Sequence, residues 1–270
     1  MNTRTLLSAF CTGLLMMPAL DTKAQDEVET IALTGTIRDF KTEHPDFESY
    51  PGTYNKVETT LGEDGKPRLD MAYYDQHYGT SNQSVYSAES FAQWFVDVPN
   101  VNISIPYTIS LEPHPTKADT YYFAREKQLS GDLKYFFPID NQGWGLSQGP
   151  LRWAQVGTHN YHFTYELETN FTYTDPGERD YEMEFAFTGD DDVWVFINGR
   201  LAVDLGGVHS QKSADVNLDD QADALGLEPG ETYTLKLFFA ERHTSESNFR
   251  IETTLELEGV PPTTVSPLYD

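Results

Sequence analysis

Three consecutive aspartates, Asp190, Asp191 and Asp192, constrain this chain most, because they separate two apolar segments that read as strands. Before them, apolar residues alternate with others through residues 183–187, the pattern of a strand with one buried face. After them, residues 193–197 are apolar on both faces and predict a strand that is covered on both sides. The acidic triplet is therefore expected in a tight loop between central strands.

The second of these strands ends in a hairpin signal. Asn198-Gly199 is a dipeptide that accepts positive φ at both central positions of a type I′ turn. Residues 200–205 then predict the return strand, and Gly206-Gly207 ends it.

Carboxylates in such a loop have a specific chemical meaning. Neighbouring strand residues point to opposite faces, so consecutive aspartates converge only where the backbone is irregular. Converging carboxylates repel each other unless a cation lies between them, and calcium prefers oxygen ligands. The segment lacks the twelve-residue EF-hand spacing, so distant residues would have to complete a metal site. A solvated acidic turn is the alternative interpretation.

Two long phrases resemble a known family. TGDDDVWVFINGRLAVDLGGVH and the later LFFAERHTSESNFRIETTL are similar to the fibro-slime family of secreted bacterial domains, several of which are associated with adhesion to cellulose. The resemblance runs from residue 33 to residue 257 and includes GTIRDF, FAQWFVDVPN, FFPID and HNYHFTYE. The family in turn resembles the lectin-type domain of anthrax protective antigen. In such lectins a calcium ion, held by two consecutive aspartates joined by a cis peptide, holds sugar hydroxyls.

The resemblance implies which residues would form the metal site. Alignment on the Asn198-Gly199 turn assigns the metal-binding pair to Asp190 and Asp191. Because Asp192 replaces the small residue that is common after the pair, a shifted pair of Asp191 and Asp192 stays open.

A second loop of these lectins supplies an amide side chain and backbone carbonyls to the calcium. Residues 240–248 occupy that place here, and Asn248 is the expected ligand. His243, Ser245 and Ser247 surround it in the sequence as candidate contacts to metal or sugar. An ordinary hairpin loop is the alternative.

Three further residues are candidates for the site. His209 and His243 could form a transition-metal site with the aspartates, because imidazole suits zinc or nickel, although a structural histidine is the plainer interpretation. Trp144, in the loop Gly143-Trp144-Gly145, could stack on a sugar ring or simply pack against the domain.

The N-terminus predicts export. Residues 1–24 read as a signal peptide, with an apolar run too short to span a bilayer and a small-residue cleavage site before Gln25. A membrane anchor is the alternative. The single cysteine, Cys11, would leave with the signal, so disulfides are not expected to stabilise the secreted domain. Residues 25–258 would form one domain and residues 259–270 a flexible tail.

The net charge of −25 limits the partners. It disfavours nucleic acid and anionic membrane surfaces, and membrane insertion is not expected once the signal is cleaved. It is compatible with a neutral polysaccharide or glycan and with cation binding, and also with a simple need for solubility outside the cell.

The remaining pattern predicts an all-β fold: a β-sandwich of antiparallel strands with long covering loops and one short helix. The helix is expected within residues 87–96, where Phe91, Trp94 and Phe95 share one face. Tyr135-Phe136-Phe137 is expected to be a core strand, and residues 218–230 a polar connection. Further strands, in order, are expected around residues 31–37, 100–111, 121–123, 159–167, 233–239 and 249–257.

These observations favour a secreted or cell-surface protein, not an enzyme, that binds carbohydrate through calcium and acts in adhesion. One alternative is an extracellular-matrix or surface protein in which calcium only stabilises a loop. A second is a glycoside hydrolase with a carboxylate pair such as Asp191 and Glu241. Aspartates clamped on calcium would be poor general acids, because the cation holds them ionised.

Overall fold

The computed structural model describes residues 30–48, 56–147 and 158–259. Ten strands and three short α-helices make up its regular structure, apart from two 3₁₀ turns. In chain order the elements are β1 (Ile31–Phe40), α1 (Met71–His77), α2 (Ala88–Phe91), β2 (Asn102–Pro113), β3 (Tyr121–Arg125), β4 (Phe163–Thr172), β5 (Glu184–Asp190), β6 (Asp192–Ile197), β7 (Arg200–Leu205), β8 (Lys212–Asn217), α3 (Leu218–Leu225), β9 (Thr232–Glu241) and β10 (Asn248–Thr253).

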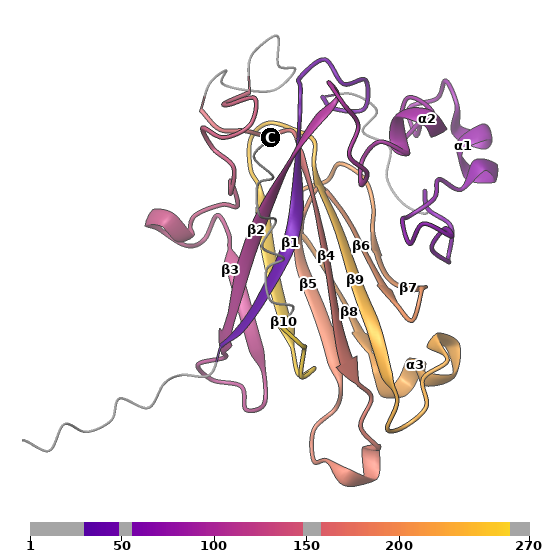
Figure 1. Cartoon of the computed structure of the whole chain (residues 1–270), viewed down its shortest axis with the longest axis vertical. Helices are drawn as coiled ribbons and strands as arrows, with labels where there is room; N and C mark the ends of the chain where they lie inside the picture. Colours follow the sequence, from indigo (N-terminus) through magenta and orange to yellow (C-terminus); the bar gives the residue numbers. More distant parts are fainter. Residues whose placement is uncertain (1–29, 49–55, 148–157, 260–270) are drawn as a thin grey trace, which may run out of the picture.

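All ten strands belong to one antiparallel sheet that folds over on itself (Figure 1). The strand order is β7-β6-β9-β4-β1-β2-β3-β10-β5-β8, and the end strands β7 and β8 contact each other, so the sheet is nearly closed. Long β2 belongs to both halves, because it pairs with β1 and then with β3. The expected all-β fold is confirmed.

The main core fills the space between the two halves of this sheet. Phe187 of β5, Phe239 of β9 and Phe249 of β10 are 0% exposed and meet there with the inward residues of the other strands. Alternation in β5 places one side-chain row in this core, as the sequence predicts. Every residue of β6 is buried, so this strand is covered on both faces.

The second cover on β6 comes from the N-terminal part of the chain. We call residues 41–48 and 56–96 the cover; α1 and α2 lie within it. Trp94 of the cover, 0% exposed, packs with Trp194 of β6 and Phe238 of β9 in a second apolar cluster. The cover is therefore an ordered layer on the outer face of the sandwich, and it lies beside β6 and β9 in Figure 1.

The hairpin after β6 is confirmed in detail. Asn198 and Gly199 have φ values of 51° and 71°, the positive values that a type I′ turn requires. The return strand β7 covers residues 200–205, as the sequence predicts.

Three local expectations differ from the structure. The segment of Tyr135-Phe136-Phe137 is not a strand, because Tyr135 has a φ of 62°; Phe136 is buried all the same. The described residues form three short α-helices instead of the one expected, and α3 lies in the expected polar connection. The helix around Phe91 is shorter than expected, with Ser87 as its N-cap.

The site end of the sandwich is set by two crossings between its halves. β5 pairs with β10 in one half, and β6 pairs with β9 in the other. The chain therefore crosses from β5 to β6 at Asp191 and from β9 to β10 through residues 242–247, which we call the β9–β10 loop. Pairing aligns Asn248 with Asp190 and Ala240 with Asp192, so the two crossings are neighbours.

The expected signal peptide lies outside the described residues, and so does the expected tail apart from Gly259. Within the described ranges, no helix has the length and apolar character needed to cross a bilayer.

Candidate functional site

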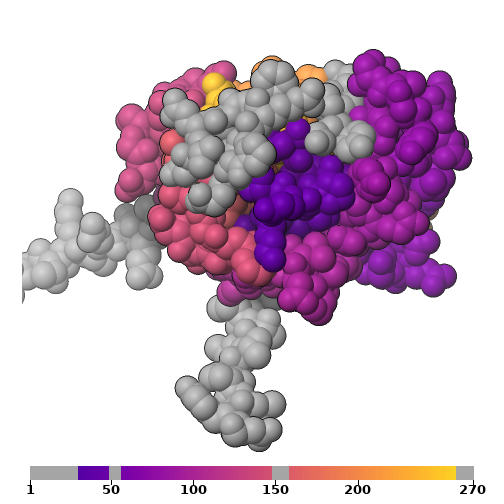
Figure 2. Space-filling model, turned by 90° about the horizontal axis from the view of Figure 1, so that it is seen from above, coloured from indigo at the N-terminus to yellow at the C-terminus, as the bar shows by residue number. Residues whose placement is uncertain are grey.

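A cavity of about 510 Å³ opens beside the two crossings. Asp190 and Asp191 both line it, and a cis peptide joins them. The rest of the lining comes from Lys127, the β7–β8 connection and the β9–β10 loop. The lining residues of these two connections are Val208, His209, Ser210, His243, Thr244, Ser245 and Glu246. Viewed from this end, the purple part of the chain occupies one side of the molecule, and the indigo part lies next to it near the middle (Figure 2).

Asn248 holds the first aspartate of the pair. Asp190 accepts hydrogen bonds from the backbone nitrogen of Asn248, at 2.5 Å, and from its side-chain nitrogen, at 2.8 Å. The amide oxygen of Asn248 accepts from the backbone nitrogen of Lys127 at 2.8 Å. Burial raises the pKa of Asp190 to about 6, although these hydrogen bonds act in the opposite direction.

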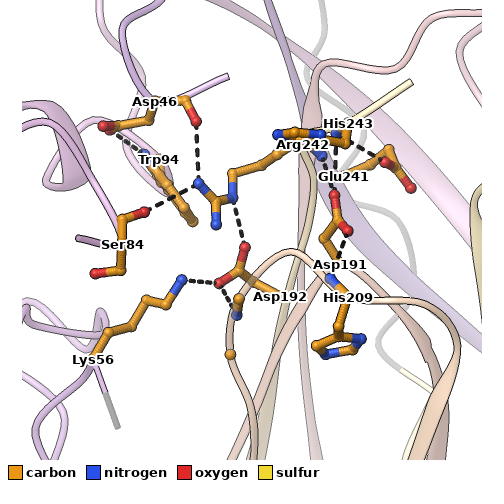
Figure 3. Close-up of polar contacts among 12 residues, drawn as sticks. Asp46, Lys56, Ser84, Trp94, Asp191, Asp192, His209, Glu241, Arg242 and His243 are labelled. Atoms are coloured by element: carbon orange, nitrogen blue, oxygen red, sulfur yellow. Dashed lines mark hydrogen bonds and ion pairs between the residues drawn. The ribbon is translucent and has the colours of Figure 1, made fainter. Parts of the chain in front are cut away.

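Backbone N–H groups of the β9–β10 loop and of the β7–β8 connection hold the second aspartate (Figure 3). Asp191 accepts from the backbone nitrogens of Arg242 at 3.2 Å, of His243 at 3.0 Å and of His209 at 3.3 Å. Burial, together with the charges of the neighbouring aspartates, raises its pKa well above the usual value, against the opposing effect of Arg242. The pair thus consists of two buried carboxylates in which the negative charge is poorly compensated.

The third aspartate has a different environment. Asp192 is 0% exposed and does not line the cavity. Lys56 donates to one of its oxygens at 2.5 Å, and Arg242 donates to the other at 2.6 Å. Burial alone would raise the pKa of Asp192, but the charges of Arg242 and Lys56 hold it at about 2. Because both of its oxygens are already bound by cationic side chains, the geometry favours the pair Asp190 and Asp191 over the shifted pair.

Glu241 is a fourth acidic residue at this end, and it was not singled out as a candidate ligand. It is 1% exposed, and burial together with the charges of Asp191 and Asp190 raises its pKa well above the usual value. Its signal in the sequence was only its place at the end of β9, beside the expected loop.

Buried polar atoms without partners gather in the same segment. Four such atoms make no hydrogen bond of ordinary geometry within the described residues: Glu241 Oε2, Arg242 Nη2, Thr244 Oγ1 and Ser247 Oγ. Native proteins leave few buried polar groups unsatisfied, and the groups that lack a protein partner commonly bind an ion or a water molecule. The loop expected to complete a metal site is therefore also a loop whose polar groups are incompletely satisfied.

The other sequence candidates are divided by the structure. His209, His243 and Ser245 line the cavity with the aspartates. Ser247 is fully buried and lies outside the lining. Trp144 also lies outside it; the residue is 41% exposed, and the Lys41 ammonium lies 4.1 Å from the centroid of its ring.

The donors suit a hard cation better than a transition metal. Within the described ranges, no group of three or more His, Cys, Asp and Glu side chains is arranged to hold a metal. Both ring nitrogens of His209 lie near backbone carbonyls, those of Ser210 at 2.9 Å and Leu205 at 3.0 Å, instead of facing the aspartates. Two carboxylates in a cavity wall that also holds the hydroxyl residues Ser210, Thr244 and Ser245 fit calcium, which accepts mixed oxygen ligands.

Comparison with known proteins supports part of the family resemblance. Residues 154–268 match the PA14 domain family. The Dictyostelium discoideum proteins psiQ and psiH are homologues: psiQ is 36% identical over 206 residues (74% of this chain), and psiH is 34% identical over 259 residues (90% of this chain). The chain spans only 18% of psiQ and 33% of psiH.

Among solved structures, the PA14 sugar-binding domain from an RTX adhesin aligns with 83% of this chain and 94% of its own, at 10% identity and a TM-score of 0.27. The PA14 match begins before β4 and so includes the aspartates and Asn248, but β1 to β3 and the cover precede it.

Proposed function

We propose that this chain is an exported, calcium-dependent carbohydrate-binding domain of the fibro-slime type that acts in adhesion. The observation that carries the proposal is the pair of buried, poorly compensated carboxylates, Asp190 and Asp191, in the wall of a cavity at the end of the sandwich. The volume of about 510 Å³ lies in the usual range for small-molecule sites.

In this proposal, calcium supplies positive charge between the two aspartates and open coordination positions for sugar hydroxyls. Asp190 and Asp191 would hold the ion, and Asn248 keeps Asp190 in place by donating two hydrogen bonds. The amide oxygen of Asn248 would have to leave Lys127 before it could act as a ligand itself. His209, His243 and Ser245 line the cavity, and the Ser245 hydroxyl offers hydrogen bonds to a bound glycan.

The family match supports a sugar as the partner. A domain of the matched family, from an RTX adhesin, is described as sugar-binding. The assignment to the fibro-slime family rests on the sequence phrases around the aspartates and the β9–β10 loop. Residues 1–24 support export, and mass spectrometry of the extracellular protein should find a terminus near Gln25. An intact Met1 on intracellular protein would contradict export.

The two alternatives make different use of the same residues. In a matrix protein, calcium would stabilise the crossings and no sugar would bind. In a hydrolase, Asp191 and Glu241 would need access to a sugar, but Glu241 is 1% exposed and lies outside the cavity lining. Release of new reducing ends from cellulose or mannan by the purified protein would support the hydrolase alternative.

The test combines melting curves with a glycan array, each with calcium and with chelator. At a hundredfold excess over Kd, calcium should add ~2.7 kcal/mol of stability and raise the melting temperature by ~5–11 °C, at ~2–4 °C for each kcal/mol in a domain of this size. Asp190→Asn should abolish both the shift and sugar binding.

Asp39→Asn is the matched control, because Asp39 is buried, also has a pKa raised by burial to about 6, and lies outside the cavity lining. It should keep the calcium shift. Metal-free protein that ignores calcium would refute the proposal, whereas a calcium shift without any bound glycan would favour the matrix protein.

A further inference from the structure

A buried cluster of charges lies on the opposite side of the aspartate crossing from the cavity. Asp192, Lys56 and Arg242 are each 0% exposed, and both carboxylate oxygens of Asp192 are bound by the two cations. The backbone nitrogen of Gly207 donates to Asp192 as well. Since Lys56 belongs to the cover and Arg242 to the β9–β10 loop, Asp192 joins three separate segments (Figure 3).

Arg242 contacts both sides of this arrangement. Its backbone nitrogen donates to Asp191, a cavity residue, while its side-chain Nε donates to Asp192. Its Nη1 donates to the backbone carbonyls of Asp46 at 3.1 Å and Ser84 at 3.2 Å, both in the cover. The guanidinium carbon lies 5.0 Å from the ring centroid of Trp94. One residue therefore connects the aspartate pair to the cover.

We propose that Asp192 and Arg242 are positioning residues that fix both crossings of the cation site and couple that site to the cover. The inference rests on the proposed calcium site. Asp191 can bind an ion only if its carboxylate keeps its direction, and the backbone of Arg242 and His243 sets that direction. The Arg242 side chain fixes this backbone against Asp192 and the cover. A side chain that cannot make these contacts should therefore change the direction of the Asp191 carboxylate.

The contacts of Arg242 explain why the coupling requires arginine. A guanidinium can bind a carboxylate and two carbonyls at once in a planar fork, whereas an ammonium is a single point charge. Partners that orient a metal ligand without touching the metal typically alter metal affinity 10–100-fold when they are replaced. The cover contributes to this arrangement although it lies outside the part of the chain that matches the PA14 family.

The experiment measures calcium affinity of the full chain, by competition with a chromophoric chelator, well below the melting temperature of each variant. Arg242→Lys should weaken calcium binding about 10–100-fold. Lys56→Met keeps the side-chain length and leaves Asp192 paired with Arg242. It should still weaken calcium binding, but by a smaller factor than Arg242→Lys does.

Arg179→Lys is the matched control, because the Arg179 side chain is 4% exposed and pairs with Asp219, whose side chain is 21% exposed, beyond the other end of β5. It should destabilise the protein without changing calcium affinity. The second readout is protease cutting of the cover: coupling is reciprocal, so calcium should slow cutting there in the wild type and lose this effect in Arg242→Lys.

The outcomes separate the two proposals. A wild type without calcium binding would refute the calcium site, and the coupling with it. A wild type that binds calcium, with an Arg242→Lys variant that binds equally well and keeps the protection of the cover, would refute the coupling alone. If Arg242→Lys does not fold, the same comparison with Lys56→Met decides, because wild-type affinity and protection in that variant would also refute it.

Discussion

Neighbouring aspartates of one triplet lie in opposite electrostatic environments. Asp192 faces the cover and is bound by two buried cations, which hold its pKa at about 2. Asp190 faces the cavity, has no cationic side chain bound to it among the described residues, and has a pKa of about 6 because of burial. The fold thus supplies positive charge to the structural aspartate and leaves the cavity pair in need of it.

The largest expected effect on stability is at Asp192. Asp192→Asn would leave Lys56 and Arg242 buried with a neutral partner, and the loss of one member of a buried ion pair typically costs ~3–5 kcal/mol. Asp190→Asn should cost much less in the presence of chelator, because no buried cation loses a partner. Urea denaturation of both variants at pH 7 measures the difference. Equal losses would show that the two aspartates are not distinct.

The pH dependence sharpens the same comparison. In chelator, the raised pKa of Asp190 means that the native state holds its proton between the ordinary value of 3.8 and about 6, so this contribution to stability falls as pH rises through that window. The difference is about two pKa units, or on the order of 3 kcal/mol. Asp192 acts oppositely: its contribution is present above pH 3.8 and is lost as pH falls toward 2.

The measurement for this prediction is the free energy of unfolding of the wild type minus that of Asp190→Asn, followed from pH 4 to pH 7 with chelator. It should fall by the amount given above. A flat difference would mean that burial does not disfavour the charged form of Asp190.

The far end of β6 offers a contrast to the site end. Gly199 has a φ of 71° and open space where a Cβ would lie, so Gly199→Val would add backbone strain without a clash, ~1–3 kcal/mol. Thermal melting should show this loss, while the calcium affinity stays that of the wild type. A changed affinity would mean that general destabilisation, and not the local network, controls the site.

The smallest effect is expected at Trp144. Lys41 lies over its ring, and the residue lies outside the cavity lining, so the structure does not bring the expected stacking platform to the aspartates. Trp144→Ala should leave glycan binding within about twofold of the wild type, as measured on the array that reports calcium-dependent binding. A large loss would place the sugar outside the cavity.

Local signals explain how much of the fold could be predicted. The strand at residues 193–197 and the Asn198-Gly199 turn depend on nearest neighbours in sequence, and both are confirmed. Helix α3 has a local signal as well: Asn217 caps its start with its side chain, and Gly226 ends it at a φ of 68°. The strand expected at Tyr135 was wrong because apolar composition does not reveal a left-handed backbone conformation.

The site was less predictable because its partners are distant in sequence. Resemblance assigned the pair Asp190 and Asp191, and the structure places both in one cavity. The role of Asp192 depends on Lys56, 136 residues away, and on Arg242, 50 residues away. No spacing rule relates these positions, so charge pairing across the sandwich could not be foreseen.

The bond between Arg242 and the Asp46 carbonyl joins residues 196 positions apart, and so does that between Thr244 and Glu48. A chain synthesised from its N-terminus releases the cover long before the arginine that anchors it exists. Lys56 and Asp46 therefore stay without Arg242, and exposed to solvent, until synthesis has nearly reached the last strand, β10. Closing such long loops slows folding, so we expect the cover to dock late in assembly.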